Sequence, residues 1–210
     1  MIIDIGPLTI LIIAIPYILY ALYDIKYKGN KNMSKYLFLF IFFVYFINLL
    51  KYAVFPIHFS EDVKNIMQEE RTILEIVKLN TNLIPFSSGF DKKDFLLNII
   101  MTLPLGFLIP CLKRDLNNKK VIILGLATGL LIEFIQLLLI FLQGFTFRNI
   151  NINDTIANFI GVYLGYKIFL LSFPILFKAF QESKEKNGFI NKFKPMFEYI
   201  LKLNQSQFKI

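Results

Sequence analysis

Five long apolar runs limit this chain to a fold that a lipid bilayer can hold. A helix rises about 1.5 Å per residue, so about 20 apolar residues cross the roughly 30 Å of hydrocarbon in a bilayer. Runs of about this length occur at Ile5–Tyr23, Tyr36–Phe55, Phe95–Leu112, Val121–Leu142 and Thr155–Phe177. A helix satisfies its backbone hydrogen bonds within one segment, as hydrocarbon requires. The sequence therefore predicts an all-α, polytopic integral membrane protein of about five transmembrane helices.

The composition agrees with a bilayer as the solvent. Of the 210 residues, 56% are hydrophobic, and the mean hydropathy is +0.58. One soluble domain of this length could not bury so much apolar surface. The first run follows Asp4 where a signal peptide would have basic residues, and no small-residue cleavage site follows it. We therefore expect the first run to remain in the membrane as an anchor.

Lysine and arginine in the short loops set the expected orientation, because such residues are retained on the cytoplasmic side. Clusters of basic residues follow the first, third and fifth runs, whereas the loop Gln143–Asp154 contains Arg148 alone. The N-terminus is therefore expected outside and the C-terminus inside. The net charge of +8 is explained by this pattern, so no nucleic-acid partner is predicted. The high usage of Lys, Asn and Ile indicates an AT-rich genome, from which we predict a bacterial plasma-membrane protein.

Two segments lie outside the predicted spans. The transmembrane domain is expected to cover residues 1–177, including an external segment, residues 56–94, in which apolar residues recur at helical spacing. We expect an interfacial helix there, either a packed connector or a lid over an outer cavity. Residues 178–210 alternate Phe, Tyr and Ile with Lys, which predicts a basic amphipathic cytoplasmic tail on anionic lipid.

A stripe of small and polar residues follows one face of each of the last two helices. On the fourth helix the stripe is Gly125, Gly129, Glu133 and Gln136. On the fifth it is Asp154, Asn158, Gly161 and Gly165. Steps of three and four residues place each set on one face, and small residues at this spacing let helices pack closely in lipid. We expect the two stripes to pack on each other, with Asn98 of the third helix near their polar ends.

Glu133 is the residue in these stripes whose position most needs an explanation. An ionised carboxylate near mid-membrane costs roughly 2.5–3.5 kcal/mol on insertion scales unless it is paired, protonated or wetted. We expect Lys51 or Arg148 as its counter-ion, or a protonated carboxyl that donates a hydrogen bond. Alternatively, Glu133 and Gln136 only bond neighbouring helices together. Arg148 is also expected to fold inward and meet Asp154 or an anionic headgroup.

Other chemistry-bearing residues are few. Cys111 and His58 are each the single residue of their type, so neither a disulfide nor a zinc site is predicted. The sequence has no phosphate-binding glycine loop, nucleotide fingerprint or nucleophile elbow. We therefore predict no metal and no cofactor. Before the fifth helix, Asn153 or Asp154 is expected to form the N-cap.

Four blocks of sequence, taken in order, resemble the VanZ-like family of membrane proteins. The blocks are "NLIPF" at Asn82–Phe86, "NIIMTLPLGFLIP" at Asn98–Pro110, "GLLIEFIQ" at Gly129–Gln136, and Arg148 followed by Asn151, Asp154, Asn158, Gly161 and Gly165. They span residues 82–165, the diagnostic region of that family. Two positions depart from its pattern, since Asn151 stands where an acid is common and Phe147 where Gly is usual.

The resemblance implies a role in the cell envelope. The named member of the family lowers susceptibility to teicoplanin without rebuilding the peptidoglycan precursor. We therefore expect a protein that lowers susceptibility to teicoplanin-type lipoglycopeptides through an outer-leaflet polar cavity. Its partner would be a membrane lipid or a lipid-linked envelope precursor, and a lipoglycopeptide antibiotic is a further candidate.

Two alternatives stay open. The chain could be a membrane enzyme acting on an envelope lipid, with Glu133 or Asp154 as acid or base and Arg148 holding a phosphate. It could also be a structural partner that packs its helices into a larger membrane complex. The sequence predicts no oligomeric state.

The expected orientation can be tested with single cysteines at Asn118 and Asn149 in a background that lacks Cys111. An impermeant thiol reagent added outside intact cells should label the cysteine at 149 and leave the one at 118 protected. Labelling after permeabilisation controls for the reactivity of each cysteine. Equal labelling of both in intact cells would contradict the orientation.

Overall fold

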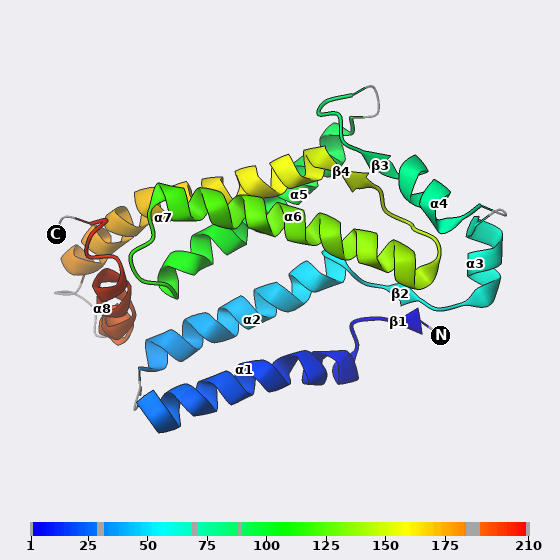
Figure 1. Cartoon of the computed structure of the whole chain (residues 1–210). Coiled ribbons are helices and arrows are strands. Elements are labelled where there is room, and N and C mark those ends of the chain that lie inside the picture. The colour runs from blue at the N-terminus through cyan, green and yellow to red at the C-terminus, as the bar shows by residue number, and fades with distance from the viewer. Residues whose placement is uncertain (1, 29–31, 69–70, 88–89, 184–189, 209–210) are drawn as a thin grey trace.

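A bundle of five long helices makes up most of the computed structural model, which describes residues 2–28, 32–68, 71–87, 90–183 and 190–208 (Figure 1). These helices are α1 (Pro7–Lys28), α2 (Met33–Ala53), α5 (Lys92–Leu108), α6 (Asn118–Gln143) and α7 (Ile152–Ser183). A 3-10 turn, η1 (Ile109–Cys111), extends α5. All five are long and apolar enough to cross a membrane. The predicted all-α fold with five spans is confirmed.

Polar caps explain why three of the helices begin one turn before their apolar runs. The side chain of Asp91 accepts hydrogen bonds from the N–H groups of Lys93 and Asp94, so α5 begins at Lys92. Asn32 and Asn117 accept in the same way from the first turns of α2 and α6. Such caps satisfy N–H groups that have no partner inside the helix. A hydropathy profile does not register them, because the capping residues are polar.

Helix α7 is packed between α5 and α6, and glycines bring the backbones close together. A Cβ on Gly165 would lie 2.0 Å from the carbonyl oxygen of Leu103 on α5. On the other side, Gly129 of α6 lies against Thr155 of α7. Gly125 lies against Phe159, one turn further along α7, and Gly161 lies against α5.

The expectation that the two glycine pairs face each other is therefore wrong. Gly161 and Gly165 lie against α5, which presents Gly106 to the backbone of Val162 in return. Glycines on both helices thus face backbone atoms of the other helix, and this allows the close backbone approach. The α6 glycines instead accommodate larger side chains on a different face of α7.

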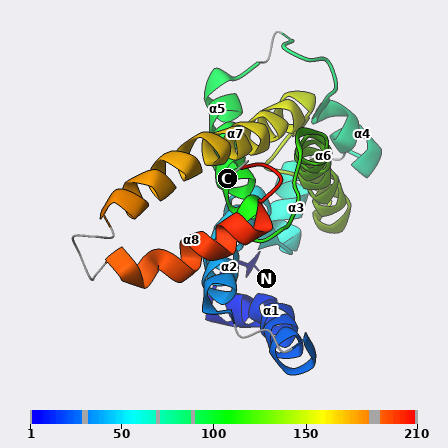
Figure 2. The ribbon, with the colours of Figure 1, turned by 90° about the vertical axis from the view of Figure 1, so that its left-hand side faces the viewer.

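The C-terminal segment packs onto one end of the bundle (Figure 2). It contains a 3-10 turn, η2 (Ile190–Phe193), and helix α8 (Lys194–Leu203). Ile200 and Phe208 are buried in a cluster with Phe169 and Phe173 of α7, and the Asn204 amide donates to the carbonyl of Pro110 at 3.0 Å. Residues 190–208 of the predicted tail are therefore part of the packed structure, and α7 continues past the expected boundary at residue 177.

The external segment contains two short helices where one was expected, α3 (Glu61–Gln68) and α4 (Ile73–Leu79). Thr72 divides them, because its hydroxyl accepts from the N–H of Glu75 while the Glu75 carboxylate accepts from the N–H of Thr72. This capping box starts a new helix. Before α3, β2 (Ile57–His58) pairs with β1 (Ile2–Ile3) in an antiparallel bridge.

A short parallel bridge joins the external segment to the loop before α7. Strand β3 (Thr81–Asn82) pairs with β4 (Ile150–Asn151), and the carbonyl of Asn80 accepts from the N–H of Ile150 at 2.8 Å. The bridge holds the segment after α4 beside the start of α7. Two stretches of the chain that are distant in sequence therefore form one surface at this end of the bundle.

The packing of α5 on α7 predicts the effect of Gly165→Ala. The added methyl group would meet backbone atoms of Leu103 and Phe107, which cannot move without shifting α5. We expect the free energy of unfolding to fall by about 1–3 kcal/mol, as for other overpacked sites. Gly6→Ala is the matched control, since nothing lies within 4 Å of its Cβ position. Thermal unfolding in one detergent compares the two, and equal melting temperatures would contradict the packing.

Candidate functional site

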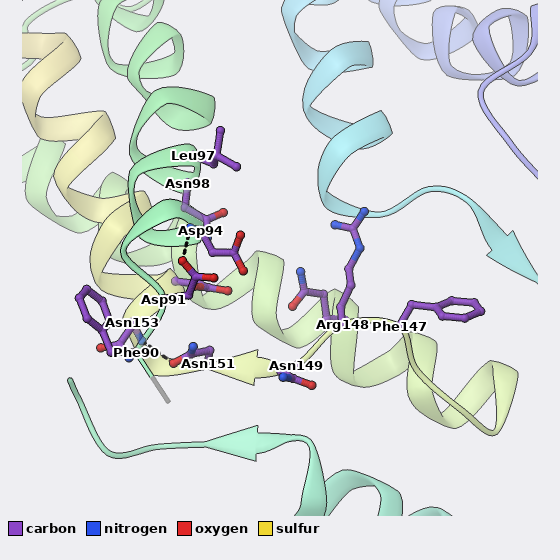
Figure 3. A pocket seen from close by; sticks show the side chains of 12 residues that line it. Phe90, Asp91, Asp94, Leu97, Asn98, Phe147, Arg148, Asn149, Asn151 and Asn153 are labelled. Carbon is purple, nitrogen blue, oxygen red and sulfur yellow. Dashed lines mark hydrogen bonds between the residues drawn. The ribbon is translucent and has the colours of Figure 1, made fainter. Parts of the chain in front are cut away.

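An open cavity of about 540 Å³ lies where α5 and α7 begin (Figure 3). Helix α5, α6, the loop before α7 and the first turn of α7 all contribute to its walls. The lining residues are Phe90, Asp91, Asp94, Leu97, Asn98, Gln136, Phe147, Arg148, Asn149, Asn151, Asn153 and Asp154. Four of the six residues predicted for a polar site are among them, namely Asn98, Gln136, Arg148 and Asp154. The other two, Glu133 and Asn158, are buried deeper in the bundle.

Glu133 is bonded to the backbone at the start of α7. Its Oε2 accepts a hydrogen bond from the N–H of Asn151 at 2.8 Å, while Oε1 has no partner within the described residues. An N–H at the positive end of a helix is a favourable partner for a carboxylate. Neither expected counter-ion occupies this position. Lys51 is exposed on α2 and forms no ion pair with any residue that the structure describes.

Arg148 joins the loop before α7 to the end of α2. Its guanidinium donates to the carbonyl of Tyr52 and, at 3.3 Å, to the carbonyl of Phe55. The last carbonyls of a helix are a usual partner for arginine. Figure 3 shows the side chain directed toward α2 and away from Asp91 and Asp94. The structure therefore places Arg148 at the end of α2 and not on Asp154, which was one of the two partners that we expected.

The conformation of Arg148 is set by its own loop. The Thr146 hydroxyl accepts from the N–H of Arg148 at 2.9 Å and donates to its carbonyl at 2.6 Å. Burial lowers the pKa of Arg148 from its usual value, but a guanidinium stays protonated in proteins. Its guanidinium is thus hydrogen-bonded to the carbonyls of Tyr52 and Phe55 at one edge of the cavity.

Carboxylates give the rest of the cavity an acidic character. Asp91, Asp94 and Asp154 line it, with Arg148 as the basic residue in the lining. Asp154 has the Asn98 side chain as its polar partner, and it lies close enough to Asp94 for their charges to interact. Within the described ranges, no three His, Cys, Asp or Glu side chains are placed to hold a metal ion.

Several buried polar atoms around the cavity have no hydrogen-bond partner among the described residues. They are Glu133 Oε1, Gln136 Oε1, Asn153 Nδ2, and both side-chain polar atoms of Asn158. Buried polar groups in proteins are nearly always hydrogen-bonded, so each such atom calls for a ligand or water. Gln136 and Asn153 are the members of this set that line the cavity.

An apolar groove of about 550 Å³ adjoins the cavity between α2 and α5. Its lining is Tyr45, Asn48, Leu49, Tyr52, Leu97, Asn98, Ile100, Met101 and Pro104. Leu97 and Asn98 line both spaces, so the polar cavity and the apolar groove are neighbours along α5. Hydropathy could not reveal this groove, because its residues look like ordinary lipid-facing positions of two helices.

The loop residues of the site were only partly predicted. Asn151 Oδ1 accepts from the N–H of Asn153 at 3.1 Å and so caps α7, whereas Asn153 or Asp154 was expected to do so. Asn153 Oδ1 instead accepts from the N–H of Phe86 at 3.0 Å, which holds the end of the "NLIPF" block beside α7. Asp91, Asp94 and Asn149 were not singled out. Their signal was weak, because acidic and amide residues are common at helix starts.

Comparison with protein-family models identifies the family of the chain. A model described as VanZ/LLP1 matches residues 42–178. The chain belongs to the VanZ/LLP1 family. Every residue that lines the cavity and the groove falls inside the VanZ/LLP1 match. Searches of curated proteins and of solved structures found no match.

The bond from Glu133 to Asn151 predicts how this VanZ/LLP1 protein responds to substitution. Glu133→Leu leaves the partly buried N–H of Asn151 without its acceptor, which costs about 1 kcal/mol or more. Glu133→Gln keeps an acceptor of the same size and serves as the matched control. We expect the leucine variant to melt at a clearly lower temperature than the glutamine variant. Equal melting temperatures for the two would show that the bond contributes nothing to stability.

Proposed function

We propose that this protein lowers the susceptibility of a bacterial envelope to teicoplanin-type lipoglycopeptides by binding a lipid or lipid-linked headgroup in its polar cavity. The observation that carries the binding role is the cavity itself, an open space lined by polar side chains, two of which, Gln136 and Asn153, each carry a buried polar atom without a partner among the described residues. Membership of the VanZ/LLP1 family supports the link to resistance. The two parts have different support and are tested separately.

A polar headgroup suits the chemistry of the cavity wall. Gln136 and Asn153 line the cavity with amide side chains that are more than nine-tenths buried, and one polar atom of each, Gln136 Oε1 and Asn153 Nδ2, has no partner among the described residues. A buried polar atom left without a partner costs about 1–3 kcal/mol. Hydroxyl, amide and amine groups of a headgroup would recover that free energy. A ligand made of hydrocarbon alone would not.

The position of the cavity agrees with a role at the outer leaflet. It lies at the end of the bundle that the distribution of basic residues predicts to face outside. Lipoglycopeptides and the precursors they bind meet the cell on that side. Teicoplanin carries an acyl chain that vancomycin lacks, so a protein acting at the lipid surface should affect teicoplanin more.

Expression in a susceptible Gram-positive host tests the resistance role. We expect the inhibitory concentration of teicoplanin to rise more than that of vancomycin. Gln136→Leu should abolish the rise, because it removes a polar atom from the cavity while breaking no hydrogen bond with a described residue.

Thr128→Val is the matched control for this experiment. It removes a polar group from the same helix at a position that does not line the cavity, where the hydroxyl donates to the carbonyl of Leu124. This variant should keep the wild-type phenotype. If the wild-type protein reaches the membrane and neither drug is affected, the resistance role is wrong. If Gln136→Leu retains full activity, the cavity is not involved.

A further inference from the structure

We propose that the cavity and the groove together hold one membrane lipid, whose headgroup carries a protonated amine and whose hydrocarbon chain lies between α2 and α5. This inference rests on the proposed function, since it takes the cavity as the ligand site. It adds the chemical class of the headgroup and the place of the chain. Three features carry it, namely the adjacency of the two spaces, the apolar character of the groove and the charge of the cavity.

The two spaces adjoin each other along α5. Leu97 and Asn98 lie in both linings, so a molecule could extend from one space into the other past these two side chains. Each space, at about 540 and 550 Å³, has the size of a typical ligand pocket. An amphiphile with a polar and an apolar part fits such a pair of spaces better than two separate ligands.

The groove is suited to hydrocarbon. Leu49, Ile100, Met101 and Pro104 are apolar residues of its lining. The Tyr45 hydroxyl donates to the carbonyl of Met101 at 3.0 Å, and the amide of Asn48 donates to the carbonyl of Val44 at 2.8 Å. Both donors are therefore already used within the protein.

The groove is also open to the bilayer. Leu97 and Ile100 are more than half exposed on the membrane-spanning helix α5. A chain already in the bilayer could reach the groove from the side. This access favours a membrane lipid over a molecule that arrives from water.

Charge complementarity assigns the headgroup. Three carboxylates line the cavity, from Asp91, Asp94 and Asp154, and the guanidinium of Arg148 is directed to the α2 carbonyls. Lys92 and Lys93 are exposed near the start of α5, and Lys51 is exposed near the end of α2, but none of these lysines lines the cavity. The lining thus carries three formal negative charges against one positive charge.

An ammonium group is therefore attracted to the lining, and a headgroup whose only charge is a phosphate is repelled. The Gln136 side chain is an independent sign of a ligand. It lines the cavity, it is more than nine-tenths buried, and its Oε1 has no hydrogen-bond partner among the described residues.

Direct binding to the purified full-length chain in detergent tests the inference. The probes are a phosphatidylethanolamine with a fluorescent acyl chain and its N-acetyl derivative, which keeps the phosphate and the chain but lacks the positive charge. Fluorescence anisotropy gives the two dissociation constants. We expect the amine probe to bind at least about tenfold more tightly, which corresponds to one favourable charge interaction.

Two substitutions divide the site into its parts. Asp94→Asn removes one lining charge from an exposed side chain, so it should reduce the preference for the amine probe without unfolding the protein. Ile100→Trp fills the groove and should weaken the binding of both probes by the same factor. Leu130→Trp is the matched control, because Leu130 is exposed to a similar degree on α6 and lies outside both linings.

Equal affinity for the two probes would overturn the headgroup assignment, and unchanged binding by Ile100→Trp would overturn the place of the chain. These failures are distinct from failure of the proposed function. Teicoplanin protection without amine preference would leave the resistance role standing and reject this inference. Amine-selective binding without any change in drug susceptibility would support this inference and reject the resistance role.

Discussion

The close approach of α5 and α7 determines where the rest of the site lies. Gly106, Gly161 and Gly165 allow the two backbones to meet with no Cβ atoms between them. The Thr102 hydroxyl adds a hydrogen bond to the carbonyl of Asn158 at 3.0 Å, deep in the same interface. With the two helices fixed in this register, Asn98 and Asp154 face each other at their starts. The polar wall of the cavity is therefore a result of backbone packing several turns away.

Buried polar groups then connect this pair of helices to the rest of the bundle. Glu133 holds α6 to the backbone before α7, and Arg148 holds the same loop to the end of α2. Each bond uses a backbone group that a helix end leaves without an internal partner. Glu133 and Arg148, which the sequence suggested as catalytic or ligand-binding residues, thus hold helices and loops together. The groups that remain free for a ligand are the carboxylates and amides between them.

Much of the architecture could be predicted from the sequence, because hydropathy and residue spacing report it directly. The five spans and the polar face carrying Gln136 and Asp154 are examples. The rotation of each helix about its axis could not be predicted, since α7 has glycines and polar residues on faces that suit either neighbour. The partner of Glu133 was also hidden, because a backbone N–H carries no residue-specific signal. Arg148 had two chemically reasonable partners, and only the fold decides between carboxylate and carbonyl.

The parallel bridge between β3 and β4 has a consequence for how such proteins can be recombined. Residues 80–86 and 150–153 form a single unit through backbone pairing and the bond from Phe86 to Asn153. In a chimera that took only one of these stretches from a relative, the two paired stretches would come from different proteins. Crossovers placed before α4 and after the first turn of α7 would keep the unit whole. Modular exchange in this family is therefore constrained by a contact that spans about 70 residues of sequence, from Asn82 to Asn151.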